Sequence, residues 1–214
     1  MHSVIILSFG ALIVVRNPLS LLVPVRFTFY CDPSIILVPT EPSRTCSSLH
    51  PHSMTVVRQA TELDFDSIWE IFHRVVQQGD TYAFDPATTK DEARSIWTAP
   101  HVATYVAETD GVVVGTYILK PNQPGLGSHV ANAGYMVHPD HAGRGIGRRM
   151  CEHSMIEARK AGYLAMQFNI VVSTNESAIA LWTKMGFSVV GVLPKVFRHR
   201  GLGLVDAYVM HRFL

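Results

Sequence analysis

The chain has 214 residues, of which 48% are hydrophobic, so it is long enough for one globular domain with an appendage. Eighteen basic and seventeen acidic residues give a formal net charge of +1. This balance excludes the large basic field that binding to nucleic acid or a membrane surface would need, so any anion must be bound locally.

The first 53 residues differ in composition from the rest. The apolar run from Val4 to Val15 stops at Arg16, short of the roughly 20 residues that span a bilayer, so no stable membrane span is predicted. We expect residues 1–53 to be a poorly ordered extension, or even an upstream translated segment. A cleaved or membrane-associated leader is the alternative. An independent domain is predicted over 54–214.

Cysteine and histidine usage argues against a disulfide framework and against a metal site. The three cysteines, Cys31, Cys46 and Cys151, are widely spaced and form no CxxC pattern. The histidines lie in turn-rich or basic stretches and form no HExxH pattern. We therefore expect no bound metal, a reducing compartment and a cytoplasmic location.

The first predicted elements are a strand over 55–58 and two helices. Thr61 and Asp64 form a capping box, which predicts a helix start, and Gly79 with Asp80 ends that helix. A second short helix is predicted over 90–97. Helical spacing assigns the apolar face of the first helix to Leu63, Ile68, Ile71, Phe72 and Val75.

Strands dominate the middle of the chain. Two predicted strands, 102–108 and 112–119, flank Asp110 and Gly111, a pair that favours a two-residue hairpin turn. A loop over 120–128 and a strand over 130–137 follow.

The second half mixes helices and strands. Helices are predicted over 145–161 and 175–185, the second closed by Gly186, and strands over 164–172, 187–193 and 204–213. Strands and helices do not alternate regularly, so the order predicts an α+β fold, a mixed α/β sandwich, and not a doubly wound Rossmann domain.

A glycine loop lies between the strand over 130–137 and the helix that follows. Gly143, Gly145 and Gly147 would leave unpaired N–H groups at the positive end of the helix dipole, which is a typical anion site. Neither GxGxxG nor GxxxxGK[ST] is present, so nicotinamide binding and nucleotide hydrolysis are not favoured. A tight turn without a ligand is the alternative. Three nearby cations could add side-chain contacts, or could form a solvated basic helix face, which is the favoured interpretation for the last of them: Arg144, Arg148 and Arg149.

Two segments carry a resemblance to a known family. "YMVHPDHAGRGIGRRM" and "FNIVVSTNESAIALWTKMGF" resemble the GCN5-related N-acetyltransferases, over roughly residues 54–214. The resemblance implies a mostly antiparallel sheet with helices on its faces and with a splayed parallel strand pair at 130–137 and 164–172. "HVANAGYMV" and "LVDAYVMHRFL" look like the yeast-type branch of that family that acts on proline analogues such as azetidine-2-carboxylate.

The resemblance also implies a coenzyme site. In the family the loop has the form [Arg/Gln]xxGx[Gly/Ala] and its amides bind the pyrophosphate of acetyl-coenzyme A (acetyl-CoA). Ala142 stands where the first Arg or Gln would be, so that one side-chain contact is missing. The matching loop residues are Gly143, Arg144, Gly145, Ile146, Gly147 and Arg148. The backbone of Tyr135, Met136 and Val137 is expected to hold the pantetheine arm.

Three asparagines are the side chains that the resemblance singles out. Asn132 and Asn169 would position the substrate or take part in catalysis, with a satisfied interior amide as the alternative. Asn175 would contact the coenzyme, with helix capping as the alternative.

The acid and the base of the reaction are not assigned by the sequence. Family members often carry Tyr where this chain has Trp182, whose spacing favours core packing. Glu108, Asp140 and His138 are base candidates by chemistry alone, and a water relay or binding of the neutral amine fits equally well. Cys151 is interpreted as a packed core residue and not as a nucleophile.

The implied activity is transfer of an acetyl group from acetyl-CoA to a small amine or an amino or imino acid. Acetylation of a protein N-terminus or lysine, which predicts an open acidic groove, and a catalytically weak acyl-CoA-binding module are the alternatives. A homodimer is expected from the resemblance. A basic loop over 194–203, with Lys195, Arg198, His199 and Arg200, is expected either to bind an acceptor carboxylate or to be a solvated turn.

Overall fold

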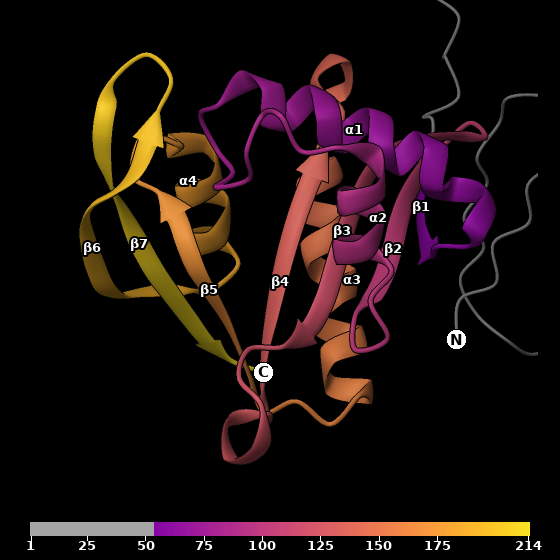
Figure 1. The fold of residues 1–214 in the computed structure, drawn as a ribbon. Helices are drawn as coiled ribbons and strands as arrows, with labels where there is room; N and C mark the ends of the chain where they lie inside the picture. The colour runs from indigo at the N-terminus through magenta and orange to yellow at the C-terminus, as the bar shows by residue number, and fades with distance from the viewer. Residues whose placement is uncertain (1–53) are drawn as a thin grey trace, which may run out of the picture. The chain divides into compact units, whose positions relative to one another are not determined.

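The computed structural model describes residues 54–214, so the extension predicted over 1–53 lies outside the described residues. These residues form one seven-stranded sheet in the order β1-β2-β3-β4-β5-β7-β6, with four α-helices (Figure 1). The predicted α+β fold is confirmed. Within 54–214, none of the helices is both long and apolar enough to cross a bilayer.

The elements follow the predicted order. The strands are β1 (Thr55–Gln59), β2 (Ala103–Thr109), β3 (Val112–Pro121), β4 (Val130–Val137), β5 (Ala165–Val172), β6 (Ser188–His199) and β7 (Gly203–Phe213). The helices are α1 (Phe65–Gln78), α2 (Lys90–Trp97), α3 (Ile146–Lys160) and α4 (Glu176–Lys184).

The sheet separates two apolar cores. Successive strand side chains point to opposite faces, so Ile118 of β3 and Met136 of β4 pack with α1 and α2. Tyr117 and Tyr135, one position away in each strand, pack with α3 and α4 on the other face. The two faces therefore have different walls, and a passage between them must cross the sheet.

Such a crossing point exists between β4 and β5. They pair in parallel over only three positions, from Val130 with Ala165 to Asn132 with Gln167. Beyond these pairs the strands diverge, as Figure 1 shows, while β4 stays paired with β3 along its whole length. The predicted splayed pair is thus confirmed.

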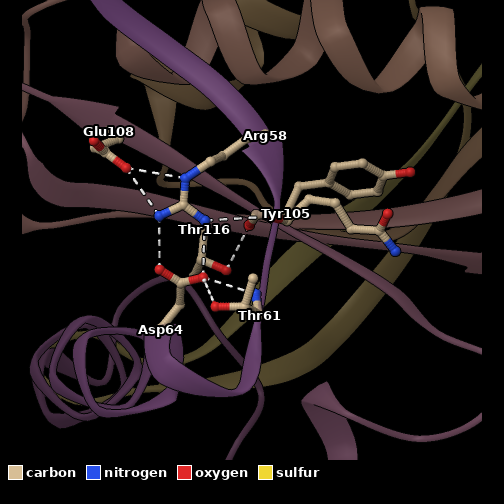
Figure 2. Close-up of polar contacts among 7 residues, drawn as sticks. Arg58, Thr61, Asp64, Tyr105, Glu108 and Thr116 are labelled. Atoms are coloured by element: carbon tan, nitrogen blue, oxygen red, sulfur yellow. Dashed lines mark hydrogen bonds and ion pairs between the residues drawn. The ribbon is translucent and has the colours of Figure 1, made fainter.

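The start of α1 is fixed by a polar cluster (Figure 2). The Thr61 N–H donates to the Asp64 carboxylate (2.7 Å), which confirms the capping box, and Arg58 donates two hydrogen bonds of 2.8 Å to the same carboxylate. Arg58 thereby holds the pKa of Asp64 far below its usual range. Residues 62–64 form a 3-10 turn before α1, which leaves Leu63 93% exposed. The prediction that Leu63 belongs to the apolar face is wrong.

The two hairpins differ in how well the sequence predicts them. Asp110 and Gly111 have φ angles of 52° and 79°, the values of the predicted two-residue turn. In the second hairpin, formed by β6 and β7, the prediction of a loop over 194–203 is wrong, because β6 continues to His199. A register shift between Leu193 and Phe197 accommodates the interruption, and the strand then resumes its pairing with β7.

The tip of the β6–β7 hairpin contacts the end of α1. The Arg200 N–H donates to the Gly79 carbonyl (2.9 Å), and its guanidinium donates to the Gln77 carbonyl (3.0 Å). Gly79 ends α1 in the left-handed conformation, at φ 65°. Arg200 therefore binds unpaired carbonyls of a helix C-terminus and does not extend into solvent.

Candidate active site

A cavity of about 880 Å³ occupies the gap between the splayed strands. Its walls come from both sides of the sheet. Val75, Tyr82 and Ile118 line it from the face covered by α1 and α2, and Ile146 and Trp182 line it from the face covered by α3 and α4. Two molecules can therefore meet at the splay, each from its own side of the sheet.

One edge of β4 is open toward this cavity. The Asn122 N–H donates to the Val130 carbonyl (2.8 Å), so the even-numbered residues of β4 are those hydrogen-bonded to β3. The odd-numbered residues turn their main-chain groups toward β5. Since pairing with β5 ends at Asn132, Tyr135 and Val137 present their main chain to the cavity.

The glycine loop has the geometry of an anion cradle. Gly143 and Gly145 have φ angles of 76° and 78°, which other residues rarely adopt, and Gly145 caps α3 without a side-chain hydrogen bond. The N–H groups of the first turn therefore point out of the helix end. A Cβ at Gly147 would lie 3.4 Å from the Leu181 side chain, so the start of α3 packs directly against α4 at this glycine.

Asn175 caps α4 and also lines the cavity. Its Oδ1 accepts hydrogen bonds from the Ala178 N–H (3.1 Å) and the Ser177 hydroxyl (3.0 Å). The helix-capping interpretation is confirmed. Because Asn175 also lines the cavity, its side chain can contact a ligand bound there as well.

Hydrogen bonds between amides link β4, β5 and the loop after β3 at the base of the splay. Asn132 Nδ2 donates to the Gln167 carbonyl (2.9 Å), which joins β4 to β5 where their pairing ends. Gln167 Nε2 donates to Asn169 Oδ1 (2.9 Å), and Asn169 Nδ2 donates to Asn122 Oδ1 (2.8 Å). We call these four residues the amide row. Asn132 and Asn169 line the cavity, so the structure brings the two predicted catalytic residues to one place.

Tyr82 is a cavity residue that the sequence analysis missed. Its hydroxyl donates to the Tyr135 carbonyl (2.7 Å) on the open edge of β4, and its ring stacks on Phe84. A Cβ at Gly134 would lie 3.3 Å from that hydroxyl, so glycine makes room for it. Burial raises the pKa of Tyr82 well above its usual range, which keeps the hydroxyl a donor. No sequence spacing indicates this contact.

Most predicted coenzyme residues line the cavity. Met136 and Arg144 do not: Met136 is buried in the core under α1, and Arg144 donates to the Asp140 carbonyl (3.2 Å) within the loop. Met136 also has an even number, which turns its main chain toward β3. The lining residues are Tyr135, Val137, Gly143, Gly145, Ile146, Gly147, Arg148 and Asn175.

Comparison with known proteins identifies the family and the fold. A model of the acetyltransferase (GNAT) family matches residues 65–187, from the start of α1 to the end of the loop after α4. The chain belongs to the GNAT family. It is therefore an acetyl-CoA-dependent N-acetyltransferase.

Individual relatives agree with this assignment. N-acetyltransferase aca1 of Schizosaccharomyces pombe is 31% identical over 151 residues, which are 63% of this chain and 72% of that protein. L-amino acid N-acyltransferase MnaT of Escherichia coli is 30% identical over 65% of this chain and 83% of its own length. A solved GCN5-related N-acetyltransferase from Kribbella flavida has a TM-score of 0.72 and 43% identity, over 75% of this chain and 98% of its own.

The cavity fits the donor that GNAT enzymes use. The outward N–H groups at the start of α3 suit a pyrophosphate, and the open edge of β4 offers main-chain partners to a pantetheine arm, as an added strand would. Arg148 adds a cation, although Glu152 pairs with it at 2.8 Å. Within residues 54–214, no Asp or Glu lines the cavity to repel the coenzyme.

The carboxylates and the histidine proposed as bases lie outside the cavity of this GNAT fold. Glu108 pairs with Arg58 (2.8 Å) at the cluster in Figure 2, and Asp140 pairs with Arg74 (2.7 Å), which lowers the pKa of Asp140. His138 does not line the cavity either. The routes for proton loss are therefore a water relay, binding of the already neutral amine, or His141, which lines the cavity although the sequence analysis did not name it as a base.

Trp182 and Cys151 have the packing roles that the sequence predicts. The Trp182 ring lies 5.0 Å from the rings of both Tyr135 and Phe168 and is buried. Cys151 is a buried residue of α3, and burial raises the pKa of its thiol to about 12. A neutral buried thiol is a poor nucleophile, so a direct transfer fits this GNAT site better than a thiol-linked one.

Proposed function

We propose that the protein transfers the acetyl group of acetyl-CoA directly to the amine of a small amino or imino acid. The observation that carries this proposal is the cavity through the sheet, lined by amides and apolar residues and, within residues 54–214, by no carboxylate. A similar protein, MnaT, is named for acylation of L-amino acids. The likeness to the proline-analogue branch in "HVANAGYMV" suggests azetidine-2-carboxylate as the first acceptor to test.

In this proposal the two faces of the sheet have separate tasks. The coenzyme supplies an activated acetyl group, held by the glycine loop from Gly143 to Arg148, the main chain of Tyr135 and Val137, and Asn175. The N–H groups on the open edge of β4 can donate to the carbonyl oxygen as negative charge forms there. Proximity of the two reactants then supplies much of the rate, with no covalent enzyme intermediate.

Asn132 and Asn169 orient the acceptor in this proposal. Asn132 Nδ2 has one hydrogen committed to the Gln167 carbonyl, and its Oδ1 accepts no hydrogen bond within residues 54–214. That oxygen can accept from an amine N–H of the acceptor. Hydrogen bonds with Gln167 and Asn122 fix the Asn169 side chain in the amide row, which also contains Asn132.

The lining disfavours a protein acceptor. A lysine side chain or a protein N-terminus would be attracted by an acidic groove, and no acidic residue lines the cavity within residues 54–214. Membership of an acetyltransferase family likewise gives no support to a binding module without activity.

A homodimer and a cytoplasmic location belong to the proposal as well. β6 is an edge strand, and its exposed valines form an apolar surface that a second copy could cover. These valines are Val189, Val190, Val192 and Val196. Light scattering of the wild type and of Val190→Lys tests the dimer, and fractionation of cells tests the location.

The acceptor is tested by incubating the full chain with acetyl-CoA and a panel of amines, with products measured by mass. The panel holds azetidine-2-carboxylate, proline, small L-amino acids, simple alkylamines, and peptides with a free N-terminus or lysine. We expect the amino and imino acids to give the highest kcat/KM. Faster turnover of peptides, or no turnover of any amino acid, would contradict the proposal.

A further inference from the structure

Lys120 lines the cavity but is not one of the residues proposed to bind the coenzyme. The formal cations that line the cavity within residues 54–214 are Lys120 and Arg148. Arg148 belongs to the start of α3 and is paired with Glu152. Lys120 makes no ion pair and no side-chain hydrogen bond within the same residues. Lys120 lines the cavity together with amides and apolar side chains, and an unpaired ammonium group in such surroundings favours an anionic ligand.

The strand register places Lys120 on the acceptor side. It lies in β3 directly opposite Asn132 of β4, so the two side chains are neighbours on one face of the sheet. That face is the one covered by α1 and α2, since Ile118 precedes Lys120 by two residues and packs there. Lys120 therefore stands beside the amide row.

The anion cannot be the coenzyme's pyrophosphate at the glycine loop. Val137 is five positions after Asn132 along β4, which is about 17 Å of extended chain, and the loop begins only after that. Lys120 is at the opposite end of the cavity from the first turn of α3. An anion bound by Lys120 therefore belongs to the acceptor.

We propose that Lys120 binds the carboxylate of the acceptor while Asn132 Oδ1 accepts a hydrogen bond from its amine. This inference rests on the proposed function and narrows it. The substrate class becomes small acids in which amine and carboxylate are close together, as in α-amino and α-imino acids. Lys120 is then the residue that separates these acids from neutral amines of the same shape.

The test compares one acceptor in two forms, azetidine-2-carboxylate and its carboxamide. The wild type should prefer the acid in kcat/KM. Lys120→Gln should reduce the ratio of acid to amide by about 10- to 100-fold, mainly through a higher KM for the acid, because a charge-assisted hydrogen bond is lost. Lys120→Arg should keep most of the ratio. The difference in amine pKa between the two acceptors is the same for every variant, so it cancels when the ratio of a variant is compared with that of the wild type.

Lys184→Gln is the matched control. Lys184 is an exposed lysine of α4 that does not line the cavity, so its loss should leave the ratio unchanged. The KM for acetyl-CoA should also be unchanged in Lys120→Gln. An equal fall in activity on acid and amide would show that Lys120 is only structural, and an unchanged ratio would show that it is a solvated side chain.

A second measurement separates this inference from the proposed function. Calorimetry with coenzyme A present measures binding of tetrahydrofuran-2-carboxylate, which has the carboxylate but no amine. The wild type should bind it, and Lys120→Gln should bind it at least about tenfold more weakly. If no amino acid is acetylated, the proposed function is wrong. The calorimetry with tetrahydrofuran-2-carboxylate still shows whether Lys120 binds a carboxylate. Absence of binding to the wild type would overturn the inference.

Discussion

The two halves of the cavity are built from different chemistry. The donor half, from the glycine loop to the open edge of β4, offers main-chain N–H and C=O groups. The acceptor half, beside the amide row, offers the side chains of Lys120, Asn132, Asn169 and Tyr82. A main-chain site tolerates many side chains but few backbone conformations. A site built from side chains depends on the identity of each side chain and less on the local backbone conformation. The two halves should therefore respond to different kinds of substitution.

The largest expected effect is in the acceptor half. Asn132→Ala should lower kcat by about 10²-fold, because an oriented amide beside the reacting groups is lost. The KM for acetyl-CoA should change little. Steady-state kinetics with each substrate varied in turn measures both values. Full turnover by Asn132→Ala would show that the acceptor half does not depend on this side chain.

A substitution outside both halves should change stability and leave activity intact. Asp64→Asn should lower the free energy of unfolding by about 2 kcal/mol at pH 7, because Arg58 and the Thr61 N–H lose a charged partner in a mostly buried place. Urea unfolding measures this value, and kcat/KM at 25 °C should match the wild type.

The pH dependence of that loss has a defined sign. The pKa of Asp64 is lowered in the folded state, so its stabilisation is fully present above the unfolded pKa of about 3.9 and is lost progressively as the pH falls from there through the much lower folded pKa. The wild type and Asp64→Asn should therefore converge in stability under acidic conditions. Parallel curves from pH 7 to pH 3 would contradict the ion-pair explanation.

The donor half should respond to backbone strain. Gly145→Val places a branched side chain at φ 78°, and we expect at least about tenfold weaker binding of coenzyme A by calorimetry. Gly111→Val is the matched control, with φ 79° and equally open space around its Cβ, but outside the cavity. If Gly145→Val and Gly111→Val weaken coenzyme A binding to a similar extent, the cause is general destabilisation and not the glycine loop.

The smallest effect is expected at the boundary of the halves. Tyr82→Phe removes the donor to the Tyr135 carbonyl, a loss of about 1 kcal/mol, which corresponds to about fivefold. Because Tyr82 holds the edge of β4 from the acceptor side, the KM values of both substrates should rise. A fall in kcat of more than about 100-fold would mean that the hydroxyl takes part in the chemistry.

The donor half could be predicted from the sequence because its determinants are local. A strand, three glycines and a helix lie within one short stretch, and β4 has the bounds predicted for it, Val130–Val137. Met136 fell outside the cavity because the pairing with β3, which no local pattern reports, decides which main-chain groups are free.

The acceptor half could be predicted only in part, because its residues meet through tertiary structure. Asn132 and Asn169 were found from the family resemblance, whereas Tyr82 reaches β4 across 53 residues of sequence. Lys120 was assigned to a loop, but β3 continues through it to Pro121. Leu63 was misplaced because a 3-10 turn shifts the start of the helical face.

The β6–β7 hairpin has a consequence for the order in which the protein is made. β7, from Gly203 to Phe213, lies inside the sheet between β5 and β6, and Arg200 holds the hairpin tip against α1, more than 120 residues earlier. A nascent chain that lacks these residues can form the glycine loop but cannot complete the sheet beyond β5. Such distant contacts form slowly, so both halves of the cavity are synthesised before the sheet is completed beyond β5, and docking of the hairpin should be a late step of folding.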